Sequence, residues 1–177
     1  MSDKRKHLSL VEIIFEIRIN KGLKAKIVIM LFRLSNYYTS KNLILKTLGL
    51  IFVMLNKMIN ELLFSVELPY KTKIKKGLII WHPHCIVINA GCEIGYNFVI
   101  RQGCTLGANK KGRPNKFIIG DGVTMGVNSS VLSDDIEVGD NVIIGAGVIL
   151  FKSIEKDHYV INKNQLLINS LPRKQSG

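Results

Sequence analysis

The sequence predicts a mainly β protein: a parallel β-helix of hexapeptide repeats that follows an N-terminal α-helical region. In the second half of the 177-residue chain, an aliphatic residue recurs every six residues, and glycine often follows it. In the first 66 residues, apolar residues recur at helical spacing instead. We therefore expect a helical region over 1–66, a β-helix over 67–152 and a C-terminal tail over 153–177.

The N-terminal region is predicted to hold three helices, over 8–19, 23–38 and 43–64, with Asn20-Lys21-Gly22 as a stop signal after the first. This region carries eleven Lys or Arg residues and four acidic residues. Amphipathic helices usually pack on a core or a neighbouring subunit. The alternative is a basic layer in peripheral contact with the inner membrane face. The longest charge-free apolar stretch, 47–56, is too short to span a bilayer.

The six-residue step explains the β-helix. Three short parallel strands make one triangular coil, and each strand points one aliphatic side chain toward the axis, where it stacks on its equivalent in the next coil. Small or turn-forming residues beside it allow the chain to turn the corner. The repeat positions are Ile74, Ile80 and Ile86, then, after a two-residue phase shift, Ile88, Ile94, Ile100 and Leu106, and after an interruption Ile119, Met125, Val131, Val138, Ile144 and Leu150.

Charge and cysteine content narrow the partners and the compartment. The formal net charge is +12, which favours an anionic partner. The sequence shows no nucleic-acid motif, so a lipid surface or a phosphorylated ligand such as coenzyme A is favoured over nucleic acid. Three cysteines without a signal peptide indicate reduced thiols and a cytoplasmic protein.

Residues 73–151 resemble the hexapeptide-repeat acyltransferases. The resemblance is to the serine acetyltransferase branch and to its relatives that O-acetylate capsular or exopolysaccharide sugars. It implies a left-handed coil, a homotrimer with active sites between subunits, and acetyl-CoA as co-substrate. The stretches that carry it are Glu67-Leu68-Pro69, Gly77-Leu78-Ile79-Ile80-Trp81-His82, Ile86-Val87-Ile88, Cys104-Thr105-Leu106-Gly107 and Ile144-Gly145-Ala146-Gly147-Val148-Ile149-Leu150.

Acetyl transfer to a hydroxyl needs a general base, and histidine suits the role because its pKa lies near neutrality. His82 occupies the place of the family's catalytic histidine; the alternative is a surface histidine beside Trp81. Glu67, fifteen residues earlier, stands where the serine enzymes carry an aspartate, and we expect it beside His82 on the adjacent rung. His84 is read as structural or substrate-facing. Cys85 is not favoured as an acyl carrier.

Further contacts are assigned to the cofactor and the acceptor. By resemblance, residues that contact coenzyme A are Gly107, Val127, Asn128 and Ala146 for the pantetheine arm, with Lys152 and Lys163 for the nucleotide. The break in the repeat between Gly107 and Phe117 is either a solvated loop or a flap whose basic residues Lys110, Lys111, Arg113 and Lys116 meet phosphates or the acceptor. No metal is expected, because His82 and His84 lack a third ligand.

Two departures from the serine enzymes set the predicted acceptor. Trp81 stands where they carry an aspartate before the catalytic histidine, and Asn115 and Lys116 stand where they carry an Arg-His pair. An aromatic side chain beside the base suits stacking on a sugar face. We therefore expect O-acetylation of a sugar hydroxyl in a capsular, exo- or lipopolysaccharide unit, free or lipid-linked. The alternatives are a serine O-acetyltransferase and a non-catalytic β-helix scaffold.

Overall fold

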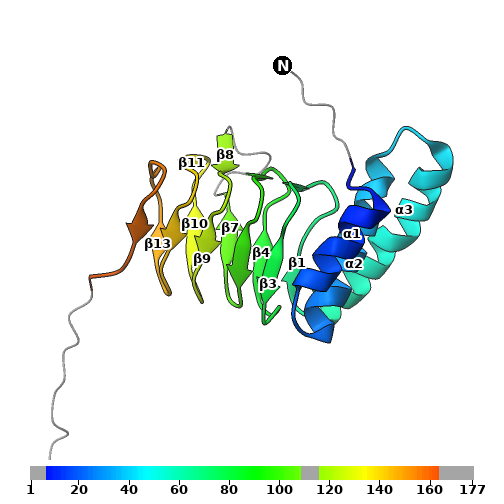
Figure 1. Cartoon of the computed structure of the whole chain (residues 1–177), viewed down its shortest axis with the longest axis horizontal. Coiled ribbons are helices and arrows are strands. Elements are labelled where there is room, and N and C mark those ends of the chain that lie inside the picture. Colours follow the sequence, from blue (N-terminus) through cyan, green and yellow to red (C-terminus); the bar gives the residue numbers. More distant parts are fainter. Residues whose placement is uncertain (1–6, 109–115, 164–177) are drawn as a thin grey trace, which may run out of the picture.

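The computed structural model describes residues 7–108 and 116–163 and shows a parallel β-helix with three helices at its N-terminal end (Figure 1). Three parallel sheets form the sides of the coil. The first sheet contains β1 (Val66–Glu67), β4 (Ile86–Ile88), β7 (Thr105–Gly107), β10 (Ser130–Leu132) and β13 (Ile149–Leu150). The second contains β2 (Lys73–Ile74), β5 (Glu93–Ile94), β8 (Lys116–Ile119) and β11 (Asp135–Val138). The third contains β3 (Ile79–Trp81), β6 (Val99–Arg101), β9 (Thr124–Met125), β12 (Ile143–Ile144) and β14 (Tyr159–Val160).

The predicted repeat positions form the core. In the second sheet, Ile74 pairs with Ile94, Ile94 with Ile119, and Ile119 with Val138, so one aliphatic column runs along the axis. All four side chains are buried. The six-residue period therefore predicted the fold class correctly, because each hexapeptide supplies one strand and one inward side chain. Left-handed winding stays a prediction.

The β-helix extends beyond its predicted end at residue 152. Ile154 forms a parallel bridge with Val138, and β14 pairs with β12. The segment 153–160, predicted to belong to the tail, thus adds two further steps to the ladder. Ile154 and Val160 continue the aliphatic columns, and both pack against the core.

The helices confirm the three predicted segments, with shifts at their ends. They are α1 (Leu10–Ile19), α2 (Leu23–Asn36) with a 3₁₀ turn at Tyr37–Thr39, and α3 (Leu43–Leu55), which continues as a π-helical segment over Asn56–Leu63. Ser9 and Glu12 form a capping box that begins α1. α2 contributes Val28, Ile29 and Phe32 to the same core cluster as the β-helix.

A buried ion pair caps the first coil. Arg33 Nε lies 2.7 Å from Glu16 Oε2, and both side chains are almost fully buried. Glu16 Oε1 accepts hydrogen bonds from the backbone N–H groups of Gly77 and Leu78, at 2.7 and 3.1 Å. Arg33 Nη1 donates to the carbonyl of Ile74 at 2.8 Å. These groups belong to the open edge of the first coil, which has no preceding coil to pair with.

Asparagines extend this cap. Asn20 donates to the carbonyl of Leu78 and accepts from the N–H of Ile80, each at 2.9 Å. Asn56 donates to the carbonyl of Leu68 at 3.0 Å. Side chains of all three helices therefore satisfy backbone groups that the β-helix edge leaves unpaired, and the helical region is an integral part of the fold.

Replacing Glu16 by Ala should lower the free energy of unfolding by about 3–5 kcal/mol, because it leaves a buried guanidinium without its counter-charge and two backbone donors without their acceptor. The measurement is urea unfolding followed by circular dichroism. Lys73→Ala is the matched control, since it removes an exposed ion pair with Glu93 and should cost at most about 1 kcal/mol. Equal losses in the two variants would contradict the cap.

Candidate active site

The first coil carries a two-residue extension at the corner between the third and first sheets. Trp81 pairs with Arg101, and Val87 pairs with Thr105. Six residue steps separate Trp81 from Val87, whereas four separate Arg101 from Thr105. The extra two residues lie within the segment that holds both central histidines. The two-residue phase shift in the sequence thus corresponds to a lengthened corner.

His82 holds an unusual backbone conformation in this corner. Its φ is 51°, and Cys85 has the same value. The corresponding corners of the next coils each contain one residue with positive φ: Gly103, Asn128 and Gly147. Cys85 matches these residues, so His82 is an additional left-handed residue. A non-glycine residue in this conformation costs on the order of 1–3 kcal/mol and is concentrated at functional sites. Its imidazole is exposed.

The extended corner begins a column of stacked corner residues. Gly103 N–H donates to the carbonyl of His84, and Asn128 N–H donates to the carbonyl of Gln102, each at 3.0 Å. Gly147 N–H donates to the carbonyl of Val127 at 2.8 Å. The chain therefore stacks His84, Gln102, Val127 and Ala146 along one edge of the β-helix. The structure brings the predicted histidine corner into line with Val127, Asn128 and Ala146, three of the residues predicted to contact coenzyme A.

Glu67 does not lie at the register position expected for it, level with His82. Glu67 pairs with Val87, twenty residues later, and is not level with His82 on an adjacent rung. The coil at this point has twenty residues, so a spacing of fifteen leaves the two side chains five residues out of register. Within the described residues, no ion pair joins Glu67 to His82. Glu67 remains exposed on the first sheet.

Two cations that were not predicted as site residues lie near the Trp81 ring. Arg101 Cζ lies 5.7 Å from the centroid of the Trp81 ring, and Lys21 Nζ lies 5.9 Å from it. Arg101 comes from the next coil, and Lys21 comes from the turn between α1 and α2. Cations at this distance from an indole are attracted by its π electrons. The surface beside His82 is therefore aromatic and positively charged. Counting one coil forward from Trp81 would have found Arg101.

The remaining predicted residues lie elsewhere. Gly107 ends β7, at the other corner of the first sheet, and Lys152 follows β13 at the equivalent corner. Lys163 is exposed at the end of the described chain. Lys116 begins β8 in the second sheet. Its ammonium forms an ion pair with the carboxylate of Glu137, and the hydrogen bond between them raises the pKa of Lys116. Lys110 and Arg113 fall outside the described residues.

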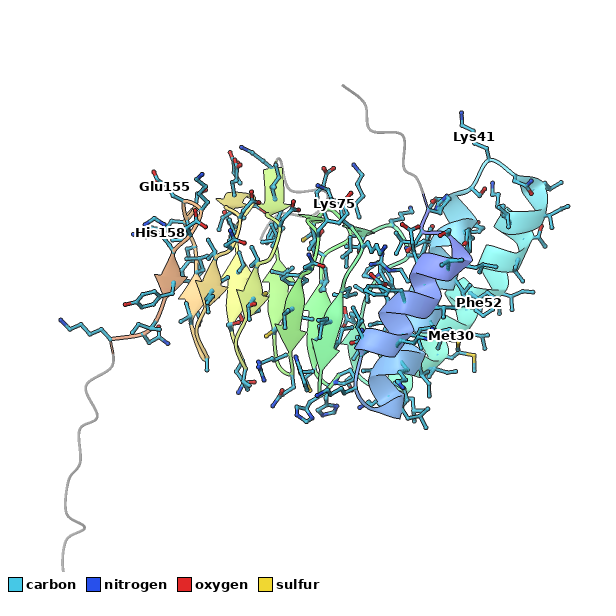
Figure 2. The ribbon with its side chains drawn as sticks, viewed as in Figure 1. Met30, Lys41, Phe52, Lys75, Glu155 and His158 are labelled. Carbon is cyan, nitrogen blue, oxygen red and sulfur yellow. The ribbon has the colours of Figure 1, made fainter. Side chains whose placement is uncertain are left out.

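The other histidines do not join this corner. His158 lies on the last coil, at the end of the β-helix opposite the helices, and its Nδ1 contacts the carbonyl of Lys156 at 2.7 Å (Figure 2). His7 contacts the ring of Tyr37 in a tilted arrangement, with the ring centroids 5.5 Å apart. Among residues 7–108 and 116–163, no group of three His, Cys, Asp or Glu side chains could hold a metal ion.

Known proteins resemble the chain in two ways. Residues 116–152 match the family described as the hexapeptide repeat of succinyl-transferase. Serine acetyltransferase isoform 3 from Entamoeba histolytica, solved with cysteine, is 26% identical, with a TM-score of 0.68, over 96% of this chain and 56% of that one. The enzyme from Neisseria gonorrhoeae, solved with serine, is 27% identical, with a TM-score of 0.65, over 78% of this chain and 54% of that one.

A serine acetyltransferase solved with CoA is also similar, at 27% identity and a TM-score of 0.61, over 76% of this chain and 53% of that one. This chain thus spans little more than half the length of the solved structures that it resembles. Among proteins of curated function, none matches the chain in sequence. The chain therefore shares hexapeptide repeats with the matched family, and it shares its fold with the serine acetyltransferases.

The cysteines give a direct test of the site's geometry. Cys85 is exposed in the extended corner, whereas Cys92 and Cys104 are buried. Burial raises the pKa of the Cys92 thiol to about 12, so this thiol stays protonated and unreactive as the pH rises toward that value. We expect a maleimide to label Cys85 alone in the native protein, and all three thiols after unfolding in urea, as read by mass spectrometry. Native labelling of Cys92 would contradict the described packing.

Proposed function

We propose that this chain, a hexapeptide-repeat β-helix of the acyltransferase type, transfers an acetyl group from acetyl-CoA to an acceptor hydroxyl, with His82 as the general base. The single observation that carries the proposal is the extended corner of the first coil. Two added residues hold an exposed histidine in a left-handed conformation, at the head of a column of stacked corner residues. A scaffold would need neither the extension nor the strain.

The reaction balances with one histidine. Neutral His82 accepts the hydroxyl proton while the hydroxyl oxygen attacks the thioester carbonyl carbon. The resulting tetrahedral intermediate collapses, the carbon–sulfur bond breaks, and the imidazolium returns the proton to the departing sulfur. The products are the O-acetyl ester and free coenzyme A. Glu67 is proposed as a positioning carboxylate for this step. Because Glu67 pairs in register with Val87, its carboxylate would have to reach His82 across the corner that precedes β4.

Several features support a binding groove for acetyl-CoA along the corner column. Val127 and Ala146 are small, and the backbone at such corners suits hydrogen bonds to the amides of the pantetheine arm. The side-chain carbonyl oxygen of Gln102, at the same corner, is buried without a hydrogen-bond donor among the described residues. Lys152 and Lys163 are exposed and remain the proposed contacts for the nucleotide phosphates. The CoA complex of a similar serine acetyltransferase supports this co-substrate.

Exposed apolar side chains on the outer faces of the β-helix support assembly into a trimer, with sites between subunits. An isolated coil would leave these side chains in water, whereas a neighbouring copy would bury them. The exposed residues of this kind on the last coils are Ile143, Ile149, Phe151, Tyr159 and Ile161.

Two acceptors are supported by different observations. The likeness to serine acetyltransferases supports serine, and it carries more weight than the sequence-based argument for a sugar. Trp81, flanked by Lys21 and Arg101, supports a sugar that bears an anionic group, because the ring can stack on the sugar face and the cations can meet the charge. Both acceptors carry a hydroxyl, and both offer a negative charge to Arg101.

Replacing His82 by Asn should lower kcat by roughly 10²–10⁴-fold, because the amide cannot take the hydroxyl proton. The measurement is thiol release from acetyl-CoA against serine, neutral hexoses, glucuronic acid and sialic acid. All proteins compared carry Cys85→Ser, which removes the exposed thiol and leaves only the buried Cys92 and Cys104. His158→Asn, on the last coil, is the matched control and should retain activity. Activity near the wild-type level in His82→Asn would contradict the mechanism, and failure to bind coenzyme A in calorimetry would favour a scaffold.

Replacing Arg101 by Gln should raise KM for a carboxylate-bearing acceptor by about 10–100-fold, the loss expected for a hydrogen bond to a charged group. KM for acetyl-CoA should change little. Turnover of serine by the wild-type protein would assign it to serine acetylation, and turnover of an acidic sugar alone would assign it to sugar acetylation. Preference for neutral hexoses, with no effect of Arg101→Gln, would contradict an anionic acceptor.

A further inference from the structure

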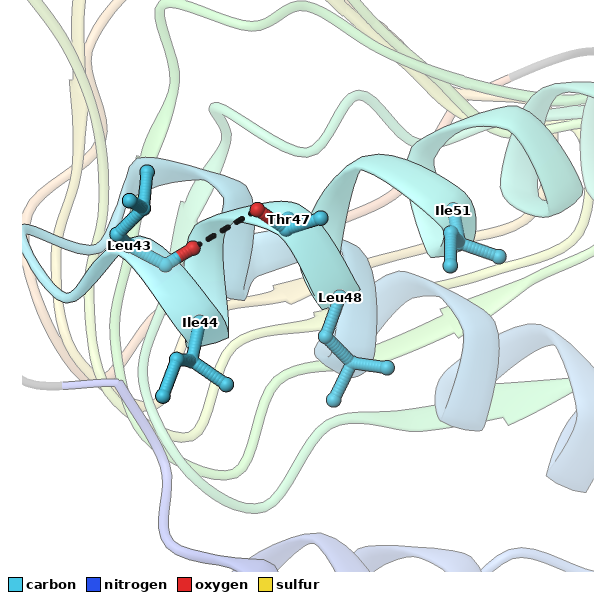
Figure 3. Close-up of a pocket in the computed structure, with 5 residues that line it drawn as sticks. All are labelled: Leu43, Ile44, Thr47, Leu48 and Ile51. Carbon is cyan, nitrogen blue, oxygen red and sulfur yellow. Dashed lines mark hydrogen bonds between the residues drawn. The ribbon is translucent and has the colours of Figure 1, made fainter.

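The outermost helix exposes a continuous apolar side. α3 and its π-helical continuation form the layer farthest from the end of the β-helix that carries β13 (Figure 1). Ile44 is 78% exposed and Leu62 is 74% exposed. Leu43, Ile44, Thr47, Leu48 and Ile51 line an open apolar groove, with Ile44, Leu48 and Ile51 on one side of the helix (Figure 3). The other large exposed side chains of this helix are Leu45, Leu50, Met54, Met58 and Leu63.

The opposite side of this helix is fastened to the body. A Cβ atom at Gly49 would lie 2.1 Å from the backbone nitrogen of Tyr38, so the two backbones touch there. Asn56 bonds to the carbonyl of Leu68, and Asn60 donates to the carbonyl of Val28 at 3.0 Å. The orientation of the helix is therefore fixed, and its apolar side faces outward as a consequence of the fold.

The dimensions of the helix suit a bilayer surface. Leu43–Leu63 spans 21 residues with a mean hydropathy of 1.5, and only 17% of its apolar window is buried. By length and composition this helix could cross a membrane. The charge-free stretch 47–56, which is too short to do so, is only part of it. One side, however, is hydrogen-bonded to the first coil through Asn56. A helix held in this way presents one face, which is the geometry of a helix lying along an interface.

The charges beside the apolar side of Leu43–Leu63 indicate what binds there. The segment 41–63 contains Lys41, Lys46 and Lys57 against a single acid, Glu61. Lys46 and Lys57 are eleven residues apart, close to three helical turns, so they lie along the same edge of the apolar side. A second copy of this face would bring like charges together, whereas anionic headgroups would neutralise them. We propose that the apolar side of Leu43–Leu63 docks on an anionic lipid surface, with the helix parallel to the membrane plane.

The proposal is independent of catalysis and is tested by vesicle flotation of the full chain. The expected result is that the protein floats with vesicles of phosphatidylcholine and phosphatidylglycerol in equal parts, and that binding to phosphatidylcholine alone is much weaker. Lys57→Glu should weaken partitioning to the anionic vesicles by about fivefold or more. Lys156→Glu, a reversal of an exposed lysine on the last coil, is the matched control and should leave partitioning unchanged.

A second variant isolates the apolar contribution. Ile44→Gln, Leu48→Gln and Ile51→Gln together replace exposed side chains, so circular dichroism and thermal unfolding should match the wild type while flotation is lost. Flotation of this triple variant at the wild-type level, or absence of flotation by the wild type, would overturn the proposal. So would an assembly in solution that loses half its mass in the triple variant, because the face would then belong to a second copy.

Discussion

The fold depends on how the first coil ends. Every later coil finds its hydrogen-bond partners in the coil before it, but the first coil has no such neighbour, and an open edge invites pairing with other chains. The Glu16–Arg33 pair and Asn20 supply those partners from the helices. Burying two charges is costly in itself. Here the cost is offset because the same carboxylate and guanidinium also bind the backbone of residues 74–78.

This arrangement also couples the helices to the site. The turn between α1 and α2, which follows the capping residue Asn20, brings Lys21 to Trp81, and Trp81 immediately precedes His82. The helical region therefore both closes the β-helix and contributes Lys21 to the surface beside Trp81 and His82. An account that treats the first 66 residues as an appendage would miss both roles.

The sequence predicted the coil well because the six-residue step is a local signal that each strand repeats. It also predicted the three helices, because the helical spacing of apolar residues is a local signal too. It failed where long-range register decides the outcome. The position of Glu67 depended on the length of the first coil, and the pairing of Trp81 with Arg101 depended on the same count. The capping role of Glu16 was hidden because one carboxylate in an amphipathic helix looks like a solvated charge. The outward face of α3 was also undetermined, since apolar residues occur almost all round that helix.

The two added residues of the extended corner are not needed to form the β-helix. Four-step corners are sufficient to turn the chain in the second coil, as Arg101 and Thr105 show. The added pair of residues in the first coil thus contributes nothing that the solenoid requires, and it sits at the surface, where length changes are easily accommodated. A first corner of four steps would be compatible with the same core and the same cap. In this fold, the corner that presents an exposed histidine can be gained or lost through an insertion or deletion of two residues, without a change in the core.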